Sequence, residues 1–190
     1  MRLFVGCDVG PAVADAAVAL IDELKTRVAR LAPRARLTWV PKERMHVTLR
    51  FIGHVDAPRA GDIAKALAPP IPHAPFEAVV QGAGVFPDRR PPRVLWAGLA
   101  SGRDDLVTLA REVNARLAAL VAADSEELTP HVTLARVKDP LGLRAQPLLA
   151  GLEHVSLGSF RVERVTLFES RQSGGVLQYV PLHRTTLEAE

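Results

Sequence analysis

The tetrapeptide His-Val-Thr-Leu occurs twice in this chain, at His46–Leu49 and again at His131–Leu134. The copies start 85 residues apart, at positions 46 and 131, which is close to half of the 190-residue length. If six histidines and nine threonines were placed at random, a chain of this length would contain roughly 0.3 His-x-Thr triplets. Two identical tetrapeptides at matching points of the chain therefore indicate a shared role.

The geometry of a β-strand decides which side chains of each motif can act together. Alternate side chains of a strand point to the same face. On such a strand His46 and Thr48 share one face, and the two apolar residues of the motif point into the core. His131 and Thr133 share a face in the same way. If an approximate two-fold axis relates the motifs, the two polar faces line one cleft that holds two imidazoles and two hydroxyls.

Two imidazoles without an accompanying carboxylate suit acid–base chemistry at a phosphodiester. Imidazole titrates near pH 6.5, so at neutral pH one ring can accept a proton while the other donates one. On opposite sides of a phosphorus atom, one ring would activate water and the other would protonate the leaving oxygen. Threonine hydroxyls can donate hydrogen bonds to the non-bridging oxygens, and arginine can add charge-assisted bonds. The motif pair thus favours phosphodiester hydrolysis.

A structural role or a metal-binding role fits these histidines less well. A single histidine on a strand is more often a core residue, but duplication at matched positions favours catalysis. A metal site would need more ligands, because each motif supplies one imidazole and neither supplies a carboxylate. The single cysteine, Cys7, excludes a disulfide framework and a thiolate metal cluster. We therefore expect no metal and no cofactor.

Hydrophobic periodicity and proline positions predict the elements around the motifs. Apolar residues three or four apart predict an amphipathic helix over residues 12–31, with prolines close to its start and beyond its end. Further helices are predicted over 56–68, 104–121 and 143–152, the last broken near Pro147. Strands are predicted over residues 2–9, 37–40, 45–53, 76–86, 94–99, 131–137, 156–170 and 175–183. We expect the strands 37–40 and 45–53 to pair through a turn at 41–44, and the last two strands to form a hairpin through 173–175.

This order of elements repeats, which predicts the fold class. Each half runs strand, helix, motif strand, helix, strand, so we interpret residues 1–190 as one domain with internal repeat halves of about 1–88 and 89–190. Several connections are too short for the crossovers of a doubly wound parallel sheet. We therefore predict an α+β fold of two lobes related by a pseudo-two-fold axis, with mainly antiparallel sheets, a central cleft and outer helices.

Composition limits the setting and the ligands. With 48% hydrophobic and 24% charged residues, the chain can bury a core and is not disordered. It holds no apolar run of the roughly 20 residues that span a bilayer, and its first residues do not form a secretory signal. We expect a cytoplasmic protein, a monomer, with no membrane partner. The net charge is +3, and 20 of the 24 basic residues are arginine, which favours anionic ligands.

The sequence also resembles a known family along nearly its whole length. Paired His-hydrophobic-Thr-hydrophobic motifs half a chain apart are typical of the two-histidine phosphoesterase superfamily. The surrounding segments resemble the RNA 2′,3′-cyclic phosphodiesterases, formerly called 2′-5′ RNA ligases. The segments that carry this resemblance are RLFV at 2–5, WVP at 39–41, HVTLRFIG at 46–53, GVFP at 84–87, RVLW at 93–96, TPHVTLAR at 129–136 and LFES at 167–170.

The resemblance implies a mechanism and a set of site residues. It implies a bilobal fold, no required metal, and hydrolysis of a terminal 2′,3′-cyclic phosphate of RNA to a 2′-phosphate. By the same resemblance, His46 is the proton donor to the departing 3′ oxygen and His131 is the proton acceptor that activates water. Thr48 and Thr133 would hold the phosphate, and Arg136 would add a further phosphate contact.

Strand geometry and the resemblance disagree about the arginines that follow the motifs. Arg136 has the opposite parity to His131, so it faces the site only if the strand twists or bulges there. Arg50 has the right parity with His46 but a weaker family resemblance. Phe51 falls on the face expected to be core.

Three alternatives stay open at the level of sequence. A module that only binds phosphorylated RNA ends would use the same cleft. A reversible 2′-5′ RNA ligase would use the same groups. Small cyclic nucleotides are a possible substrate in place of RNA. The aromatic residues Trp39, Phe86, Trp96 and Tyr179 could stack on a base, but in a chain with 5% aromatic residues we expect them to pack in the core.

Overall fold

The computed structural model describes residues 1–88, 90–122 and 128–189. In this part of the chain, ten strands form one sheet. The strands are β1 (Arg2–Asp8), β2 (Arg36–Trp39), β3 (His46–His54), β4 (Ile71–Pro72), β5 (Phe76–Phe86), β6 (Val94–Ser101), β7 (Val132–Asp139), β8 (Ser156–Val162), β9 (Arg164–Ser173) and β10 (Val176–Glu188). The helices are α1 (Gly10–Leu31), α2 (Ala57–Leu67), α3 (Arg103–Leu117) and α4 (Ala145–Leu149), with a short 3₁₀ helix η1 (Lys42–Arg44). None of the described helices is long and apolar enough to cross a membrane.

The strand order is symmetric about the middle of the sheet. It runs β4-β10-β9-β1-β3-β7-β6-β5-β8, with β2 paired to β7 beside this path. The order β10-β9-β1-β3 on one side mirrors β8-β5-β6-β7 on the other, so that β3 corresponds to β7 and β1 to β6. The pairs are antiparallel except for the short β4, which runs parallel to β10. The expected α+β fold with two related lobes and mainly antiparallel strands is confirmed.

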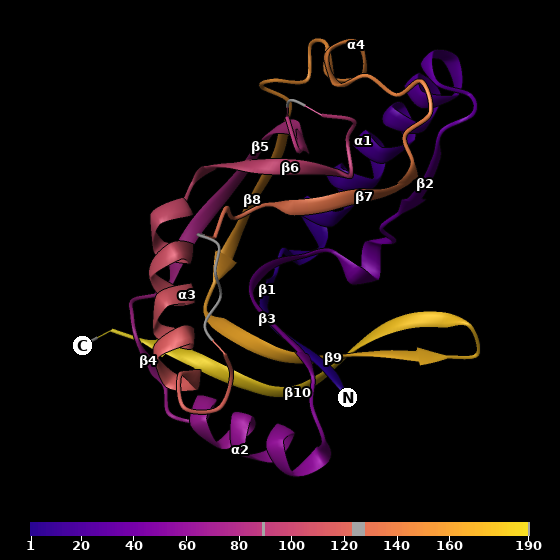
Figure 1. The fold of residues 1–190 in the computed structure, drawn as a ribbon. Helices are drawn as coiled ribbons and strands as arrows, with labels where there is room; N and C mark the ends of the chain where they lie inside the picture. Colours follow the sequence, from indigo (N-terminus) through magenta and orange to yellow (C-terminus); the bar gives the residue numbers. More distant parts are fainter. Residues whose placement is uncertain (89, 123–127, 190) are drawn as a thin grey trace.

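Helices α1 and α3 each lie on the lobe opposite to the one that holds the preceding strand, whereas α2 and α4 stay on the lobe of theirs. Helix α1 follows β1 but packs against β8, and α3 follows β6 but packs against β3 and α2. In Figure 1, α2 and α3 accordingly lie beside the lobe of β1, β3, β9 and β10, while α1 and α4 lie beside the other lobe. Neither lobe is therefore built from one continuous half of the chain. The duplication with halves near 1–88 and 89–190 stays a prediction about the sequence.

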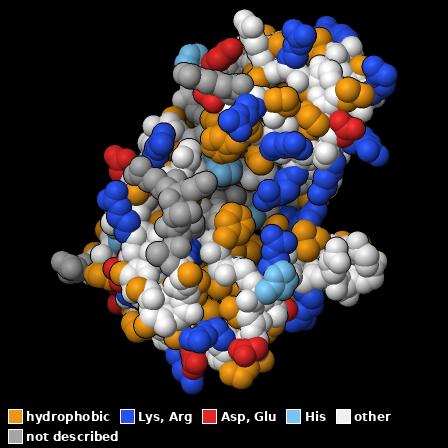
Figure 2. Space-filling model, in the orientation of Figure 1, with side chains coloured by type: hydrophobic (Ala, Val, Ile, Leu, Met, Phe, Trp, Pro, Cys, Tyr) orange, Lys and Arg blue, Asp and Glu red, His pale blue; other side chains and the backbone are white. Residues whose placement is uncertain are grey.

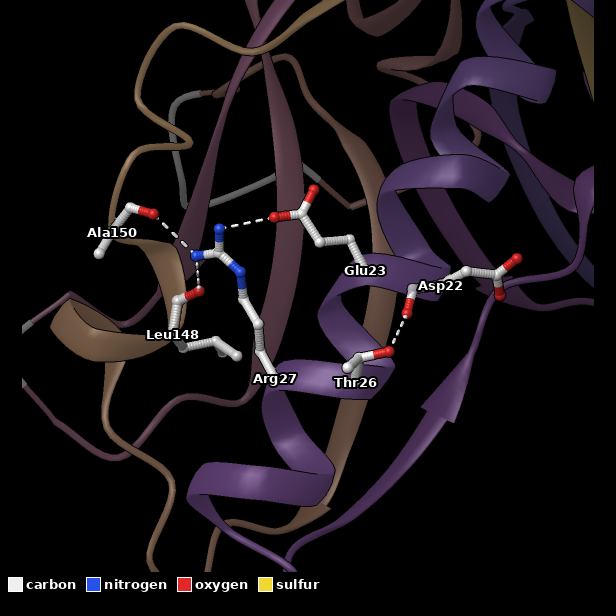
Figure 3. Close-up of polar contacts among 6 residues, drawn as sticks. All are labelled: Asp22, Glu23, Thr26, Arg27, Leu148 and Ala150. Carbon is white, nitrogen blue, oxygen red and sulfur yellow. Dashed lines mark hydrogen bonds and ion pairs between the residues drawn. The ribbon is translucent and has the colours of Figure 1, made fainter.

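Helix α1 buries the stripe that its sequence predicts. Its buried residues are Val13, Ala14, Ala17, Leu20, Ile21, Leu24 and Val28. This spacing places them on one face of a helix, where they join the apolar side chains of the sheet in one core. The helix holds its neighbour α4 through Arg27, whose guanidinium donates to the carbonyls of Leu148 (2.9 Å) and Ala150 (2.8 Å) and pairs with Glu23 (Figure 3).

Two predicted details of the strands are wrong. Strand β2 pairs with β7 rather than with β3, because β3 meets β7 only at Val47 and Val132 and then diverges, which leaves the edge of β7 free for β2. The predicted strand 156–170 is two strands that belong to different lobes. Strand β8 pairs with β5, whereas β9 pairs with β1 and β10. The hairpin through 173–175 is confirmed, since Val176 lies opposite Ser173.

Candidate active site

The two motifs meet at the centre of the sheet. Strands β3 and β7 are neighbours, and their single register pair joins Val47 to Val132, the second residue of each motif. His46 begins β3, and His131 comes directly before β7. The sheet therefore brings together two motifs that are 85 residues apart in the chain.

A β-bulge in β3 changes which residues face the site after the first motif. Gly6 pairs with Thr48 and Val5 with Arg50, so Leu49 is the extra residue. Leu49 and Arg50 are both buried, and the Arg50 guanidinium donates to the carbonyl of Ala122. The parity argument that placed Arg50 beside His46 is therefore wrong, because a bulge reverses the alternation of side chains.

The same bulge brings an aromatic residue to the surface of the site. Phe51 is 55% exposed and lines the cavity described below, so its expected place in the core is also wrong. A phenyl ring that leaves the core at this position is available to a ligand, since exposed large apolar side chains at a cavity often mark binding surfaces.

Strand β7 has the matching bulge after the second motif. Trp96 pairs with Thr133 and Leu95 with Ala135, so Leu134 is the extra residue and both Leu134 and Ala135 are buried. Arg136 then lies on the same side as Thr133, and both line the cavity. This is the bulge that the sequence argument required for Arg136 to face the site.

A cavity of about 490 Å³ opens between the lobes at the motifs. This size is within the usual range of ligand pockets, about 300–1,000 Å³. Figure 2 shows the hollow in the face turned to the viewer, with hydrophobic side chains on its walls and Lys and Arg side chains along one side. Its lining residues are Arg2, Leu3, Phe4, Thr38, Trp39, Val40, Arg44, His46, Thr48, Phe51, Gly53, Thr133, Arg136, Lys138, Ser170, Leu177 and Tyr179.

The two imidazoles are held in the same way. The Nδ1–H of His46 donates to the carbonyl oxygen of Arg44 at 2.8 Å, and the Nδ1–H of His131 donates to that of Thr129 at 2.7 Å. In both motifs the acceptor is the backbone two residues earlier. Because Nδ1 carries the proton, Nε2 of each neutral ring is left as the reactive nitrogen. The Nε2 atom of His46 lies 2.9 Å from Oγ1 of Thr48, whose hydroxyl can donate to it.

Burial lowers the pKa of both histidines below the ordinary value of 6.5. The hydrogen bonds to the backbone oppose this effect, while the charge of Arg136 adds to it for both rings. The charge of His131 also lowers the pKa of His46, which couples the two titrations. At neutral pH the lowered pKa values favour the neutral form of both rings, which suits a base. A ring that acts as an acid must instead gain a proton when an anionic ligand binds.

Aromatic side chains supply much of this burial. The His46 ring centroid lies 4.8 Å from that of Phe4 and 5.2 Å from that of Tyr179. The His131 ring centroid lies 5.1 Å from that of Phe86 and 6.5 Å from that of Trp96. The sequence alone does not place these aromatic residues beside the histidines, because their strands are distant from the motifs in the chain. Among the residues that the structure describes, no group of three or more His, Cys, Asp or Glu side chains could hold a metal ion.

Comparison with known proteins assigns the chain to a family. The family described as LigT like phosphoesterase matches residues 12–96 and 99–178. The chain belongs to the LigT-like phosphoesterases. Both motifs and most of the cavity lining lie within the matched residues.

Curated relatives of this LigT-like phosphoesterase carry the name RNA 2′,3′-cyclic phosphodiesterase. The protein of that name from Aeropyrum pernix is 34% identical over 171 residues, which cover 86% of this chain and 94% of the relative. That from Aquifex aeolicus is 35% identical over 136 residues, covering 70% and 72%. A crystal structure from Thermus thermophilus has a TM-score of 0.76 at 26% identity and covers all of both chains. Escherichia coli LigT in complex with 3′-AMP has a TM-score of 0.71 at 23% identity, covering 98% of this chain and 97% of that one, and shows the shared fold.

Proposed function

We propose that this protein hydrolyses the 2′,3′-cyclic phosphate at RNA ends to a 2′-phosphate. The observation that carries the proposal is the matched pair of imidazoles, each fixed through Nδ1 so that Nε2 is the nitrogen left for proton transfer. Curated relatives that cover most of this chain are named for the same reaction. The cationic lining of the cavity suits a phosphate ligand.

In the proposed reaction His131 is the base and His46 the acid. The Nε2 atom of His131 takes a proton from water as the water oxygen attacks phosphorus. The bond between phosphorus and the 3′ oxygen breaks, and protonated His46 gives its proton to that oxygen. The product keeps the phosphate on the 2′ oxygen. The negative charge of the bound phosphate opposes the lowering of the His46 pKa by burial, and so keeps the acid protonated.

The remaining polar groups would hold the phosphate during this transfer. Thr48 and Thr133 line the cavity from the two motif strands, and Arg136 lies on the face of Thr133. Hydroxyl and guanidinium donors can bind the non-bridging oxygens, where negative charge is held in the transition state. Phe51, exposed at the cavity, offers a surface on which the terminal base can stack.

Substitution of each histidine tests the proposal. The substrate is a short RNA oligonucleotide with a 2′,3′-cyclic phosphate, and the measurement is the rate and identity of the product. His46→Ala or His131→Ala should lower turnover by about 10²–10⁴-fold, the usual contribution of a general acid or base. His54→Ala is the matched control, because His54 ends the same strand and lies outside the cavity lining. EDTA should have little effect.

The outcomes separate this function from its alternatives. Turnover near that of the wild type in either motif variant would contradict the acid–base scheme. Binding of the oligonucleotide without any product would support a module that only binds RNA ends. Joining of a 2′,3′-cyclic end to a 5′-hydroxyl end would support a 2′-5′ ligase. Faster turnover of small cyclic nucleotides than of RNA would make these the substrate.

We also propose that the protein acts as a monomer in the cytoplasm. One cysteine cannot form an internal disulfide, which fits a reducing compartment. The thiol is buried, and burial raises its pKa to about 12, which disfavours the reactive thiolate. Light scattering coupled to gel filtration tests the oligomeric state. A mass near 20.5 kDa is expected.

A further inference from the structure

We propose that Arg44 binds the phosphodiester that links the terminal nucleotide to the preceding one, so that the enzyme prefers an RNA end to a cyclic mononucleotide. This inference rests on the proposed function and extends it to the substrate class. It gives a role to a side chain that lies outside the two motifs and that the sequence argument did not select.

The charge of the cavity exceeds what one cyclic phosphate needs. Arg2, Arg44, Arg136 and Lys138 line it, and no carboxylate does so among the residues that the structure describes. A 2′,3′-cyclic phosphate carries one negative charge, which Arg136 and the two threonines of the motifs can meet. The other cations therefore suit further phosphates of the same ligand, since backbone phosphates are the groups that Lys and Arg contact most in nucleic acids.

Among these cations, Arg44 has the side chain that the structure positions best for binding a phosphate. It ends η1, and its own carbonyl oxygen accepts the Nδ1–H of His46, so its backbone is tied to the reactive ring. Its guanidinium carbon lies 6.0 Å from the ring centroid of Tyr179, a cation–π arrangement. The aromatic face supports the guanidinium while its N–H groups stay free to donate in the guanidinium plane.

The guanidinium has no acidic partner in the described part of the chain. Its Nε atom is buried without a hydrogen-bond partner. A buried donor that lacks an acceptor has a free-energy cost, which a bound phosphate oxygen would remove. In contrast, Arg27, Arg116 and Arg171 are each paired with a glutamate.

The position of Arg44 fits a neighbouring phosphate rather than the reacting one. The Tyr179 ring contacts both the His46 ring, at 5.2 Å between centroids, and the Arg44 guanidinium carbon, at 6.0 Å from the Tyr179 centroid, so both side chains lie beside this one ring. Arg136 lies on the same side of β7 as Thr133 of the second motif, so we assign Arg136 to the reacting phosphate. Arg44, which lies in η1 and against Tyr179, is then left for the preceding linkage of an RNA strand.

A comparison of substrates tests this role. The first substrate is a dinucleotide with a 2′,3′-cyclic phosphate end, and the second is the cyclic nucleoside 2′,3′-monophosphate with the same terminal base and no 5′ phosphate. Arg44→Ala should lower kcat/KM for the dinucleotide by about 10- to 100-fold, as expected for one charge-assisted contact. The loss of kcat/KM for the mononucleotide should be clearly smaller, because that substrate has no internal phosphate for Arg44 to bind. Arg59→Ala, an exposed arginine of α2 outside the cavity lining, is the matched control and should affect neither.

A neutral linkage makes the test specific to the phosphate. In the wild type, a methylphosphonate at the internal linkage of the dinucleotide should reduce kcat/KM by the same factor as Arg44→Ala. In the Arg44→Ala variant it should cause little further loss, because the two changes remove one interaction. Arg44→Lys should recover part of the loss, and hydrolysis of the mononucleotide by each variant shows that this variant folds.

Four results would contradict the inference or the proposed function on which it rests. Equal losses on the dinucleotide and the mononucleotide would place Arg44 at the terminal nucleotide. No loss on either would show that Arg44 binds no phosphate. Independent losses from the methylphosphonate and from Arg44→Ala would mean that another group contacts the linkage. If the wild type hydrolysed neither substrate, the proposed function itself would fail, which is a distinct result.

Discussion

Gly6 offers a way to move a catalytic ring without removing any functional group. It lies in β1 opposite Thr48, at the bulge of β3. A Cβ atom added at Gly6 would come within 2.7 Å of the backbone oxygen of Val47 and 3.3 Å of Cδ2 of His46. Because the first of these is a backbone atom in a paired strand, no side-chain rotation can relieve the contact. We therefore expect Gly6→Ala to displace β3 at the first motif.

The size of the effect follows from these distances. The 2.7 Å approach is 0.7 Å short of the 3.4 Å at which ordinary contact begins. Overpacking of a well-packed site costs about 1–3 kcal/mol in the free energy of unfolding. A displacement of about 1 Å in an active site can cost about 10²-fold in rate, so a shift of several tenths of an ångström should lower kcat by roughly 10-fold.

Turnover of a cyclic-phosphate oligonucleotide and urea unfolding together measure the two effects. Gly61→Ala is the control, because Gly61 lies in α2 with open space around it. There the alanine should raise the free energy of unfolding by about 0.5–1 kcal/mol and leave turnover unchanged. If Gly6→Ala kept the turnover and the unfolding free energy of the wild type, the reasoning about the close approach of β1 and β3 would be refuted.

Two further predictions concern arginines with different roles. Arg136→Gln removes a charge that lowers the pKa of both histidines, so both limbs of the pH profile of kcat/KM should move to higher pH. The value of kcat/KM at the optimum should also fall by about 10- to 100-fold, because a phosphate contact is lost. A profile that stayed in place or moved to lower pH would contradict the assigned charge effect. Arg27→Ala removes the hydrogen bonds from α1 to the carbonyls of Leu148 and Ala150. The free energy of unfolding in urea should therefore fall by about 1–3 kcal/mol, with turnover unchanged. An unchanged unfolding midpoint would show that α4 is held by its apolar contacts alone.

The sequence predicted most of the elements because their signals are local. The apolar stripe of α1 and the alternation in the strands depend on neighbours a few residues away, and both appear in the structure nearly where expected. The two motifs were also recognisable in isolation, because their residue types and their repetition do not depend on knowing how the strands pair.

What the sequence could not predict depends on contacts between distant segments. The bulges at Leu49 and Leu134 come from the pairing of β3 with β1 and of β7 with β6, and neither leucine differs from an ordinary strand residue. Parity arguments therefore failed within two residues of each motif, for Arg50 and Phe51 after the first and for Arg136 after the second. Tyr179 contacts His46 across 133 positions of the chain, so its place beside the ring follows only from the order of the sheet.

The exchange of helices between the lobes bears on how the enzyme can move. The polypeptide crosses from one lobe to the other at two connections, since β1 leads to α1, which packs on β8, and β6 leads to α3, which packs on β3. A hinge opening between β3 and β7 would leave α1 on β8 and α3 on β3, but it would stretch the connections from β1 to α1 and from β6 to α3. These two crossings therefore limit how far the lobes can separate. A peptide bond cleaved between β5 and β6 would leave two fragments that stay assembled, because each fragment completes the hydrophobic layer of the other.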